Sequence, residues 1–385
     1  MYIPNYKNGS IVNLMSSITS ACGDNPIYKP IQSLNPSELS KSSNIVLIII
    51  DGLGYEYLTT HGKNTILMEH LKDKLTSVFP STTASGITSF LTGVSTQQHA
   101  ITGWFVYLKE LGLVSTILPF NPRCGGLPFG KIDIKPEVIF SQKTVFEKIN
   151  RKSYHITNRR YVNSDYTTAY CKGAKRLSYK NLSNFFKRIK KAIKSKYDKK
   201  FICAYWPCFD ALCHEYGTKS NEVSNHFTEL NERITSLLKS IENKNTTVII
   251  TADHGLIDTN KSKIVHLKNH PKLLDALALP LSGDPRVAYC YVRPSKTKQF
   301  EDYIDQNFKD ICDLYKSEDL VKRNFFGLFE PNKKLFDRIG DYTLIMKENY
   351  IIKDFVLGEE EKYLIGHHGG VSKEEMFVPL IVFET

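Results

Sequence analysis

Short runs of consecutive apolar residues, many of them β-branched, recur along the chain and are separated by longer amphipathic stretches. A run that stays apolar at successive positions is typical of a strand whose two faces are both buried, as in a parallel sheet. Four runs of this kind predict buried strands over Ile45–Ile50, Phe201–Trp206, Val248–Thr251 and Val378–Phe383.

The amphipathic stretches between these runs predict helices. In Ser220–Asn243, apolar side chains return every three or four residues and share one helical face; they are Phe227, Leu230, Ile234, Leu237 and Ile241. Strands that alternate with helices along a chain form a parallel sheet that is covered on both sides. The expected fold class is therefore α/β, with a doubly wound, mostly parallel central sheet and helices on both faces.

One segment departs from this alternation. Two strand-like stretches, Arg286–Arg293 and Asp341–Met346, flank a helix-like stretch, Lys298–Lys316. We expect a small inserted α+β subdomain over residues 260–360 that leans over the functional site, within one domain that spans residues 1–385.

The composition is that of an ordinary globular protein, with 385 residues, 41% hydrophobic and 24% charged. No stretch is long and apolar enough to span a bilayer, and Met1–Asn13 lacks the charged-then-apolar order of a signal peptide. We therefore expect a cytoplasmic protein without a membrane span, with leaderless export as the alternative. The eight cysteines are dispersed without paired spacing, which favours reduced thiols.

The formal charge of +11 favours anionic partners. Much of the excess comes from Lys187–Lys200, where apolar residues at helical spacing predict an amphipathic helix with a basic outer face. A solvated face is the favoured interpretation of such a charge run, and a nucleic-acid surface is the alternative. No finger or aromatic-rich RNA-binding signature accompanies it, so nucleic-acid binding is not supported.

Polar residues with metal-binding chemistry lie beside the predicted strands. Asp51 ends the first run, Asp253 and His254 follow the third, and His368 lies just before the last. The carboxyl ends of the strands form the edge at which open α/β sheets bind their ligands. We therefore expect these side chains to meet at that edge, with His367 as a competitor of its neighbour His368.

Two further candidates lie on helix-like segments. Asp210 and His214 are four residues apart after a predicted strand, so in a helix they share one face and suit a single metal ion. The hydroxyls of Ser81, Thr82 and Thr83 precede a helical stretch, whose positive end favours an anionic oxygen or a bound phosphate. Local chemistry does not choose among the three hydroxyls. Taken alone, the hydroxyls could be ordinary helix caps, and Asp210 with His214 could be a surface pair.

Taken together, seven residues have the chemistry and spacing to hold two divalent metal ions around a nucleophilic hydroxyl. A mixture of aspartate and histidine ligands suits zinc or a similar ion, and manganese is the alternative. The seven residues are Asp51, Thr83, Asp210, His214, Asp253, His254 and His368.

The order of the motifs around these residues resembles that of a known family. The segments DG, FPSTTAS, FDALCHEYG, ADHG and HHGGVSKEEMFVPL follow one another from Asp51 to Pro379. This order resembles the alkaline phosphatase superfamily and, within it, the type I phosphodiesterase/nucleotide pyrophosphatase branch. The match is specific because five motifs occur in sequence over nearly the whole chain.

The resemblance implies two zinc ions and a nucleophile three residues after the proline of the FP motif, which is Thr83 here. It implies that one ion is held by Asp51, Thr83, Asp253 and His254, and the other by Asp210, His214 and His368. One departure is visible: the resemblance leads us to expect an asparagine three residues beyond the nucleophile, and this chain has Gly86 there.

The expected function is hydrolysis of phosphate diesters or nucleotide pyrophosphates through a covalent phospho- or nucleotidyl-threonine. The expected substrate is a small anionic phosphate ester, a nucleotide in the first instance. A phosphomonoesterase or phosphonate hydrolase with the same site is the alternative, because Gly86 puts the ester specificity in question. A non-catalytic binding protein of this fold is the third reading, and the presence of all seven ligands argues against it.

The segment Trp104–Phe140 bears on this choice. Its glycine, proline and aromatic content predicts a long loop near the site. Diester specificity calls for an apolar slot for the second ester group, although aromatic residues in a loop more often serve packing. Five aromatic residues are candidates for such a slot: Trp104, Phe105, Tyr107, Phe120 and Phe129.

Overall fold

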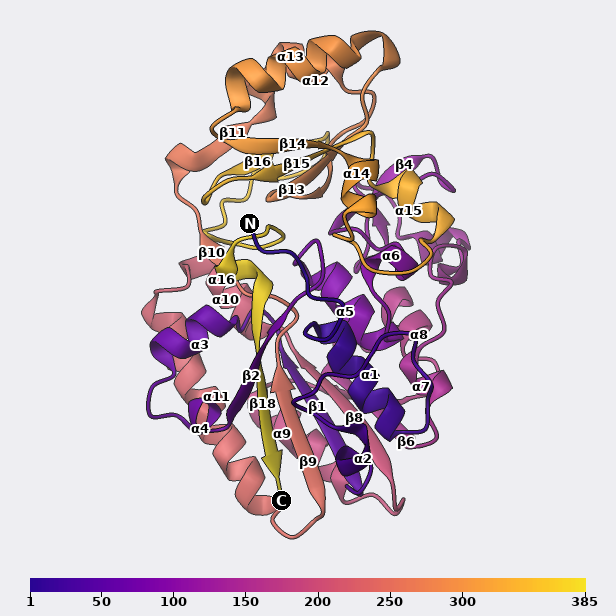
Figure 1. Ribbon diagram of the computed structural model, residues 1–385, viewed down its shortest axis with the longest axis vertical. Helices are drawn as coiled ribbons and strands as arrows, with labels where there is room; N and C mark the ends of the chain where they lie inside the picture. The colour runs from indigo at the N-terminus through magenta and orange to yellow at the C-terminus, as the bar shows by residue number, and fades with distance from the viewer.

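The centre of the protein is a seven-stranded sheet, seen in a computed structural model that describes residues 1–385 (Figure 1). Its strand order is β2-β18-β9-β1-β8-β6-β7, and the neighbours from β9 to β7 are all parallel. The mostly parallel sheet predicted from the apolar runs is confirmed. Its strands are β1 (Asn44–Ile50), β2 (Leu71–Thr76), β6 (Lys152–Asn158), β7 (Lys175–Tyr179), β8 (Lys200–Trp206), β9 (Thr246–Thr251) and β18 (Phe377–Glu384).

The three central strands end level with one another. Ile50 of β1 lies opposite Trp206 of β8, and Ile49 lies opposite Thr251 of β9. All seven residues of β1 are buried, as the continuous apolar run requires of a strand covered on both faces. The chain segments that leave these strands therefore begin at the same edge of the sheet.

Helices cover both faces of this sheet. In Figure 1, α1 and α5 lie on one side, and α9 and α11 lie on the other. The helix predicted over Ser220–Asn243 is confirmed as α11. The helices around the sheet include α1 (Ile11–Ala21), α3 (Tyr55–His61), α5 (Thr83–Thr92), α8 (Asp165–Tyr170), α9 (Leu182–Ile193), α10 (Cys208–Tyr216), α11 (Asn221–Ser240) and α16 (Lys373–Met376).

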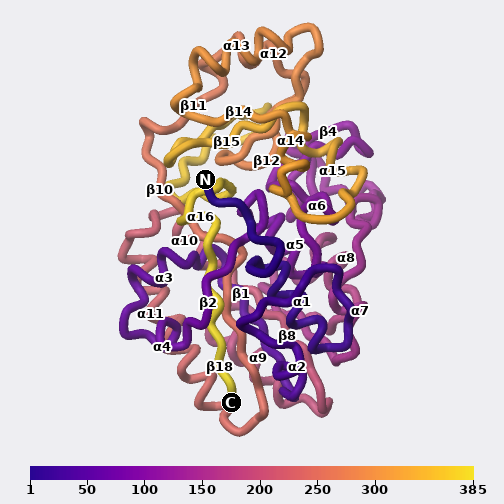
Figure 2. The backbone as a smooth tube through the Cα atoms, in the orientation of Figure 1, coloured from indigo at the N-terminus to yellow at the C-terminus, as the bar shows by residue number.

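Strand β18 is the antiparallel exception. It pairs antiparallel with β9 on one side and with β2 on the other. The preceding residues, up to Met376, lie at the carboxyl edge of the parallel strands, so the chain can enter the sheet only by running back from that edge. The last strand in Figures 1 and 2 accordingly runs from the middle of the molecule to the C-terminus at its far end.

A second sheet of seven strands lies beyond the carboxyl edge of the first (Figure 1). Its order is β14-β15-β13-β12-β3-β4-β5 and all its pairs are antiparallel. Helices α12 (Pro271–Ala276) and α13 (Thr297–Phe308) cover its outer face. The strands are β3 (Phe105–Leu108), β4 (Leu113–Thr116), β5 (Asn121–Pro122), β12 (Ser282–Asp284), β13 (Val287–Cys290), β14 (Cys312–Lys316) and β15 (Tyr342–Met346).

The prediction of a long loop over Trp104–Phe140 is wrong at its start. Residues 105–122 form β3, β4 and β5 of the second sheet, with the turn between β3 and β4 closed at Gly112, whose φ is +70°. The strands are only four residues long or shorter, too short to give a clear alternation among glycines and prolines. The second sheet thus combines these strands with others from the 260–360 segment, and a separate subdomain over 260–360 stays a prediction.

Two predicted helices end earlier than expected. The stretch Lys298–Lys316 is a helix only to Phe308, and Cys312–Lys316 is strand β14, which pairs with β15. Ile311 and Leu314 fit either structure locally, and pairing with a neighbouring strand decides between them. The basic helix ends at Ile193 rather than Lys200, because the chain must turn back before β8 begins at Lys200.

Two further findings concern the chain as a whole. All eight cysteines are unpaired and six are buried, in agreement with the reduced thiols predicted. None of the helices combines the length and the apolar character that crossing a bilayer requires.

A buried ion pair joins the two sheets. Arg286, in the turn between β12 and β13, donates from Nε and Nη2 to Glu375 of α16 over 3.0 and 2.8 Å. The side chains are 1% and 0% exposed. Glu375 also accepts the Gly370 N–H at 2.8 Å. The pair therefore fixes the loop that precedes β18 against the second sheet.

We expect Glu375→Ala to lower the free energy of unfolding by about 3–5 kcal/mol, because it leaves the Arg286 guanidinium buried without its partner. Urea unfolding followed by circular dichroism measures this loss. The matched control is Glu38→Ala, which removes an exposed pair with Lys41 and should change the unfolding midpoint little. Equal effects of the two substitutions would contradict the role given to the buried pair.

Candidate two-metal active site

Three carboxylates meet where the central strands end. Asp51 directly follows β1, Asp253 follows β9 by one residue, and Asp210 lies in the first turn of α10, just after β8. Their residues are 2%, 0% and 8% exposed, so all three carboxylates are withdrawn from water. These residues lie together at one edge of the sheet, as predicted, because β1, β8 and β9 end level with one another.

His254 lies between two of these carboxylates. Its Nε2 atom is 3.3 Å from Asp51 Oδ1 and 3.6 Å from Asp253 Oδ2. Its Nδ1 atom is 3.0 Å from the carbonyl oxygen of Gly255, which can only accept, so Nδ1 carries the proton. The lone pair of Nε2 therefore faces two carboxylate oxygens, an arrangement that a cation between them would stabilise.

The third carboxylate lies against two other imidazoles. One turn along α10, His214 Nε2 is 3.2 Å from Asp210 Oδ2, and its Nδ1 is 2.7 Å from the carbonyl oxygen of Gly366. His368 Nε2 is 3.9 Å from Asp210 Oδ1. The rings of His368 and His254 stack with their centroids 3.8 Å apart. The competitor His367 turns away, with Nε2 3.1 Å from the carbonyl oxygen of Leu364.

The donor atoms fit divalent cations. They form two compact groups that share His254: Asp51, Asp253 and His254, and Asp210, His254 and His368. Ligand atoms around tetrahedral zinc lie about 3.3 Å apart, since zinc bonds to nitrogen and oxygen are about 2.0–2.1 Å long. The distances of 3.3 and 3.6 Å from His254 Nε2 to the two carboxylate oxygens match this spacing, and the distance of 3.9 Å from His368 Nε2 to Asp210 Oδ1 is longer.

Unpartnered polar atoms in the site support this fit. One oxygen of each of the three carboxylates, together with His368 Nδ1, is buried without a hydrogen-bond partner. A buried carboxylate oxygen without a donor is costly, and metal coordination is one of the few ways to satisfy it.

The pKa values of the site are shifted by burial and by neighbouring charges. Burial raises the pKa of Asp51 well above its usual value, and the nearby Asp253 and Asp210 raise it further. Burial and the Lys353 ammonium lower the pKa of His367 to about 3. Burial lowers the pKa of His214, but the Asp210 carboxylate outweighs it and raises that pKa to about 9. Carboxylates this close together favour bound cations.

The structure distinguishes the three candidate hydroxyls. Thr83 is the first residue of α5, and its Oγ1 lies 3.1 Å from His254 Nε2, inside the ligand group. Thr82 Oγ1 donates instead to Asp284 Oδ1 at 3.0 Å, and Ser81 Oγ donates to the carbonyl oxygen of Gly370 at 2.7 Å. Thr83 alone of the three directs its hydroxyl to the metal-binding side chains.

Gly86 lies where α5 packs closely against the end of β9. A Cβ atom at Gly86 would lie 2.8 Å from Cβ and 3.2 Å from the carbonyl oxygen of Asp253. A side chain there, such as that of the asparagine expected from the resemblance, would push α5, and Thr83 with it, away from the end of β9. Gly86 therefore permits this close packing.

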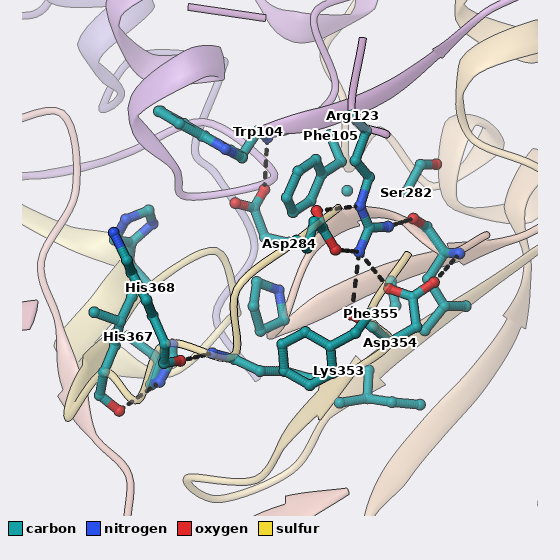
Figure 3. Close-up of a pocket in the computed structure, with 18 of the residues that line it drawn as sticks. Trp104, Phe105, Arg123, Ser282, Asp284, Lys353, Asp354, Phe355, His367 and His368 are labelled. Atoms are coloured by element: carbon teal, nitrogen blue, oxygen red, sulfur yellow. Dashed lines mark hydrogen bonds and ion pairs between the residues drawn. The ribbon is translucent and has the colours of Figure 1, made fainter. Parts of the chain in front are cut away.

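A cavity of about 640 Å³ opens onto the site (Figure 3). Thr83, Asp210, His214 and His368 line one end, and an aromatic wall lines another part. Of the five aromatic residues proposed for a slot, Trp104 and Phe105 line the cavity, joined by Phe355.

The other three proposed aromatic residues do not belong to this slot. Phe120 and Phe129 are buried in the core with exposed fractions of 0% and 1%. Tyr107 packs edge-on against Tyr291, with ring centroids 5.1 Å apart. These three aromatic residues therefore serve packing, which was the alternative role considered for aromatic residues in this segment.

Some residues of the site had no motif to reveal them. Asp284 of β12 accepts from Thr82 and, at 3.3 Å, from the Trp104 N–H, so it connects the second sheet to the loop of Thr83. The Tyr205 hydroxyl donates to Asp51. Arg123 lies 4.1 Å above the Phe105 ring. These contacts join distant parts of the chain, and no local pattern predicts them.

Residues 45–371 match the family described as Type I phosphodiesterase / nucleotide pyrophosphatase. The chain belongs to this family. As a member, it is a phosphoester hydrolase of the alkaline phosphatase superfamily, in agreement with the resemblance found in its motifs. The family is typically dependent on divalent metals, and the two ligand groups of this chain agree with that requirement.

Solved structures share the fold. Murine ectonucleotide pyrophosphatase/phosphodiesterase 5, as an inactive threonine-to-alanine variant in complex with AMP, superposes with a TM-score of 0.64 at 16% identity, covering 87% of each chain. The human protein gives 0.65 at 16% identity, covering 88% of this chain and 87% of that one. Phosphonoacetate hydrolase from Sinorhizobium meliloti 1021, in complex with phosphonoacetate, gives 0.63 at 17% identity, covering 88% and 89%.

We expect Asp253→Asn to lower the zinc bound per chain, because it removes a charged ligand from the group around His254. Elemental analysis of protein dialysed against zinc and then against buffer measures the loss. The control Asp341→Asn changes an aspartate of the second sheet that accepts the Val292 N–H and should leave the zinc content unchanged. Equal zinc in all three proteins would refute the ligand role of Asp253.

The Asp284 carboxyl gives a prediction for pH. Burial raises its pKa from 3.8 to about 7, against the lowering effect of the Thr82 hydrogen bond. The folded protein thus favours the protonated carboxyl, so its stability falls as the pH rises from about 4 through 7. Asp284→Asn cannot ionise. We expect it to gain up to about 4 kcal/mol relative to the wild type between pH 4 and pH 8.

Urea unfolding of chelator-treated protein at several pH values tests this expectation, because chelation removes the effect of bound cations on the carboxyl. A difference between the two proteins that stays constant from pH 4 to pH 8 would show that Asp284 does not change its ionisation in this range.

Proposed function

We propose that the protein hydrolyses phosphate diesters or nucleotide pyrophosphates, with two divalent metal ions, zinc in the first instance, and with Thr83 as the nucleophile. The observation that carries the proposal is the place of the Thr83 hydroxyl, 3.1 Å from His254 Nε2 among buried aspartates and histidines, at the end of a 640 Å³ cavity. A small phosphate ester can enter such a cavity.

The proposed division of the ligands follows the two groups of donor atoms. One ion would be held by Asp51, Thr83, Asp253 and His254, and the other by Asp210, His214 and His368. The shared position of His254 between the two groups is compatible with neighbouring ions. When bound, such ions neutralise charge on the phosphoryl oxygens and favour the ionised forms of hydroxyl and water.

The chain itself supplies the nucleophile and its orientation. The Thr83 hydroxyl loses its proton, its oxygen forms a bond to phosphorus, and the bond from phosphorus to the leaving oxygen breaks. The leaving group takes up a proton from solvent, and the phospho- or nucleotidyl-threonine remains. Water then attacks the phosphorus, the bond from phosphorus to the Thr83 oxygen breaks, and that oxygen takes up a proton. The first hydrogen bond of α5 is donated by the Gly86 N–H to the Thr82 carbonyl oxygen, so the N–H groups of residues 83–85 are free to bind phosphoryl oxygens.

The related structures support this proposal. An inactive form of the murine relative carries a threonine-to-alanine change and was solved with AMP, which agrees with a threonine nucleophile and a nucleotide substrate. The aromatic wall of Trp104, Phe105 and Phe355 offers an apolar surface to a second ester group and favours diesters over monoesters.

A phosphomonoesterase or phosphonate hydrolase with the same site is the second candidate. The observation in its favour is the similar fold of phosphonoacetate hydrolase, solved with phosphonoacetate and phosphonoformate. Comparison of p-nitrophenyl phosphate with bis-p-nitrophenyl phosphate and the p-nitrophenyl ester of thymidine monophosphate separates the candidates. A higher kcat/KM for the two diesters supports the proposal, and a clear preference for the monoester overturns the diester assignment.

We expect Thr83→Ala to lower kcat for the preferred ester on the order of 10⁴-fold or more, because the covalent route is lost. Its zinc content should stay near that of the wild type, since the aspartates and histidines remain. Thr92→Ala, at the last residue of the same helix, is the control for helix stability. Full turnover by Thr83→Ala would move the nucleophile to Thr82 or Ser81.

A further inference from the structure

One cationic side chain of the cavity is not paired with an acid. Lys353, the last residue of β16 (Ile351–Lys353), is half-buried and lines the cavity. Its Nζ donates to the carbonyl oxygen of Lys362 at 3.2 Å, and it forms no ion pair with a carboxylate. In Figure 3 its side chain extends toward the side of the cavity that holds His367 and His368.

The two other basic side chains of this wall each have an acidic neighbour, which is buried for Arg123 and exposed for Lys362. Arg123 pairs with Asp354 at 2.7 Å and with Glu359 at 2.8 Å. Its third nitrogen donates to the carbonyl oxygen of Leu281 at 2.6 Å. Lys362 has Glu360 at 3.9 Å. Arg123 therefore has little capacity left for a ligand, and Lys353 is the cation that a bound anion would find unpaired.

The Lys353 ammonium is partly withdrawn from water. Burial lowers the pKa of Lys353, and the acid that opposes this effect, Glu359, is hydrogen-bonded to Arg123. An unpaired, partly desolvated ammonium is stabilised when an anion binds to it.

We propose that Lys353 binds a second anionic group of the substrate, while the phosphoryl group that reacts lies at Thr83. This inference rests on the proposed function and narrows its substrate class to esters or phosphonates that carry another anion near the reacting phosphorus. A neighbouring phosphate, as in a pyrophosphate, or a carboxylate, as in a phosphonocarboxylate, has the required charge. Lys353 is then a specificity residue of the cavity, separate from the seven proposed ligands of the site.

The first test measures binding by calorimetry on the zinc-loaded protein with AMP and with ADP in its uncleavable α,β-methylene form, called ADP below, which differ by one phosphate. The wild type should bind ADP more tightly than AMP. Lys353→Met keeps the length and apolar character of the stem and removes the charge. We expect it to lower the ratio of ADP to AMP affinity by about 10- to 100-fold, the effect of losing one charged hydrogen bond.

Two further variants make this test specific. Lys353→Arg keeps the positive charge and should keep most of the preference for ADP. Lys263→Met is the matched control, because this lysine belongs to the same part of the fold but pairs with Glu348 at 2.8 Å and does not line the cavity. It should leave the ratio of affinities unchanged. Should Lys353→Met fail to fold, Lys353→Gln, which also removes the charge, takes its place with the same expected loss.

The second test distinguishes a carboxylate from a phosphate. Phosphonoacetate is compared with methylphosphonate in the same wild-type and Lys353→Met proteins. A loss of preference confined to this pair identifies a carboxylate as the second anion, and one confined to ADP and AMP identifies a phosphate. Wild-type protein without a preference in either pair, or a Lys353→Met protein that keeps both preferences, overturns the inference.

Different results would contradict the proposed function and the role of Lys353. A wild-type protein that binds ADP more tightly than AMP through Lys353 but cleaves neither bis-p-nitrophenyl phosphate nor a nucleotide pyrophosphate contradicts the diester activity alone. A protein that cleaves these esters with no dependence on the second charge contradicts only the role of Lys353.

Discussion

Mutual repulsion among three buried carboxylates is the constraint on which the rest of the structure depends. Asp51, Asp210 and Asp253 are held together by the level ends of β1, β8 and β9, and each keeps one oxygen without a hydrogen-bond partner. In the absence of positive charge, this arrangement is unfavourable by several kcal/mol for each group. The central sheet thus places three buried carboxylates at its carboxyl edge, and bound cations would stabilise them there.

The second sheet makes this edge into a site with defined walls. Asp284 connects it to the threonine loop, and the Arg286–Glu375 pair fixes the glycine-rich loop that carries His368. Neither contact touches the proposed ligands directly. Both act by holding backbone segments that would otherwise be free to move, which is how distant residues keep ligand atoms at a set spacing.

The parts predicted from sequence are those that local patterns encode. The continuous apolar runs identified the central strands, and residues at their ends identified the carboxylates and His254. The four-residue strand β3 and the strand β14 within a helix-like stretch were missed, because pairing with distant strands decides them. The role of Gly86 could not be predicted for a similar reason: it depends on contact with Asp253, 167 residues along the chain. Arg123 and Lys353 come to line the cavity only through folding, from segments far apart in the chain.

The two sheets both contribute to the cavity, and they differ in how well they tolerate substitutions. The part that holds Thr83 and the proposed ligands comes from the first sheet, where Gly86 leaves no room even for a methyl group. The outer wall of the cavity comes from strands and loops of the second sheet, where Arg123 is anchored by bonds within the protein. Substitutions in that wall can alter which molecules are accepted without disturbing the chemistry. A fold arranged in this way can diversify its substrates over evolution while its reaction stays the same.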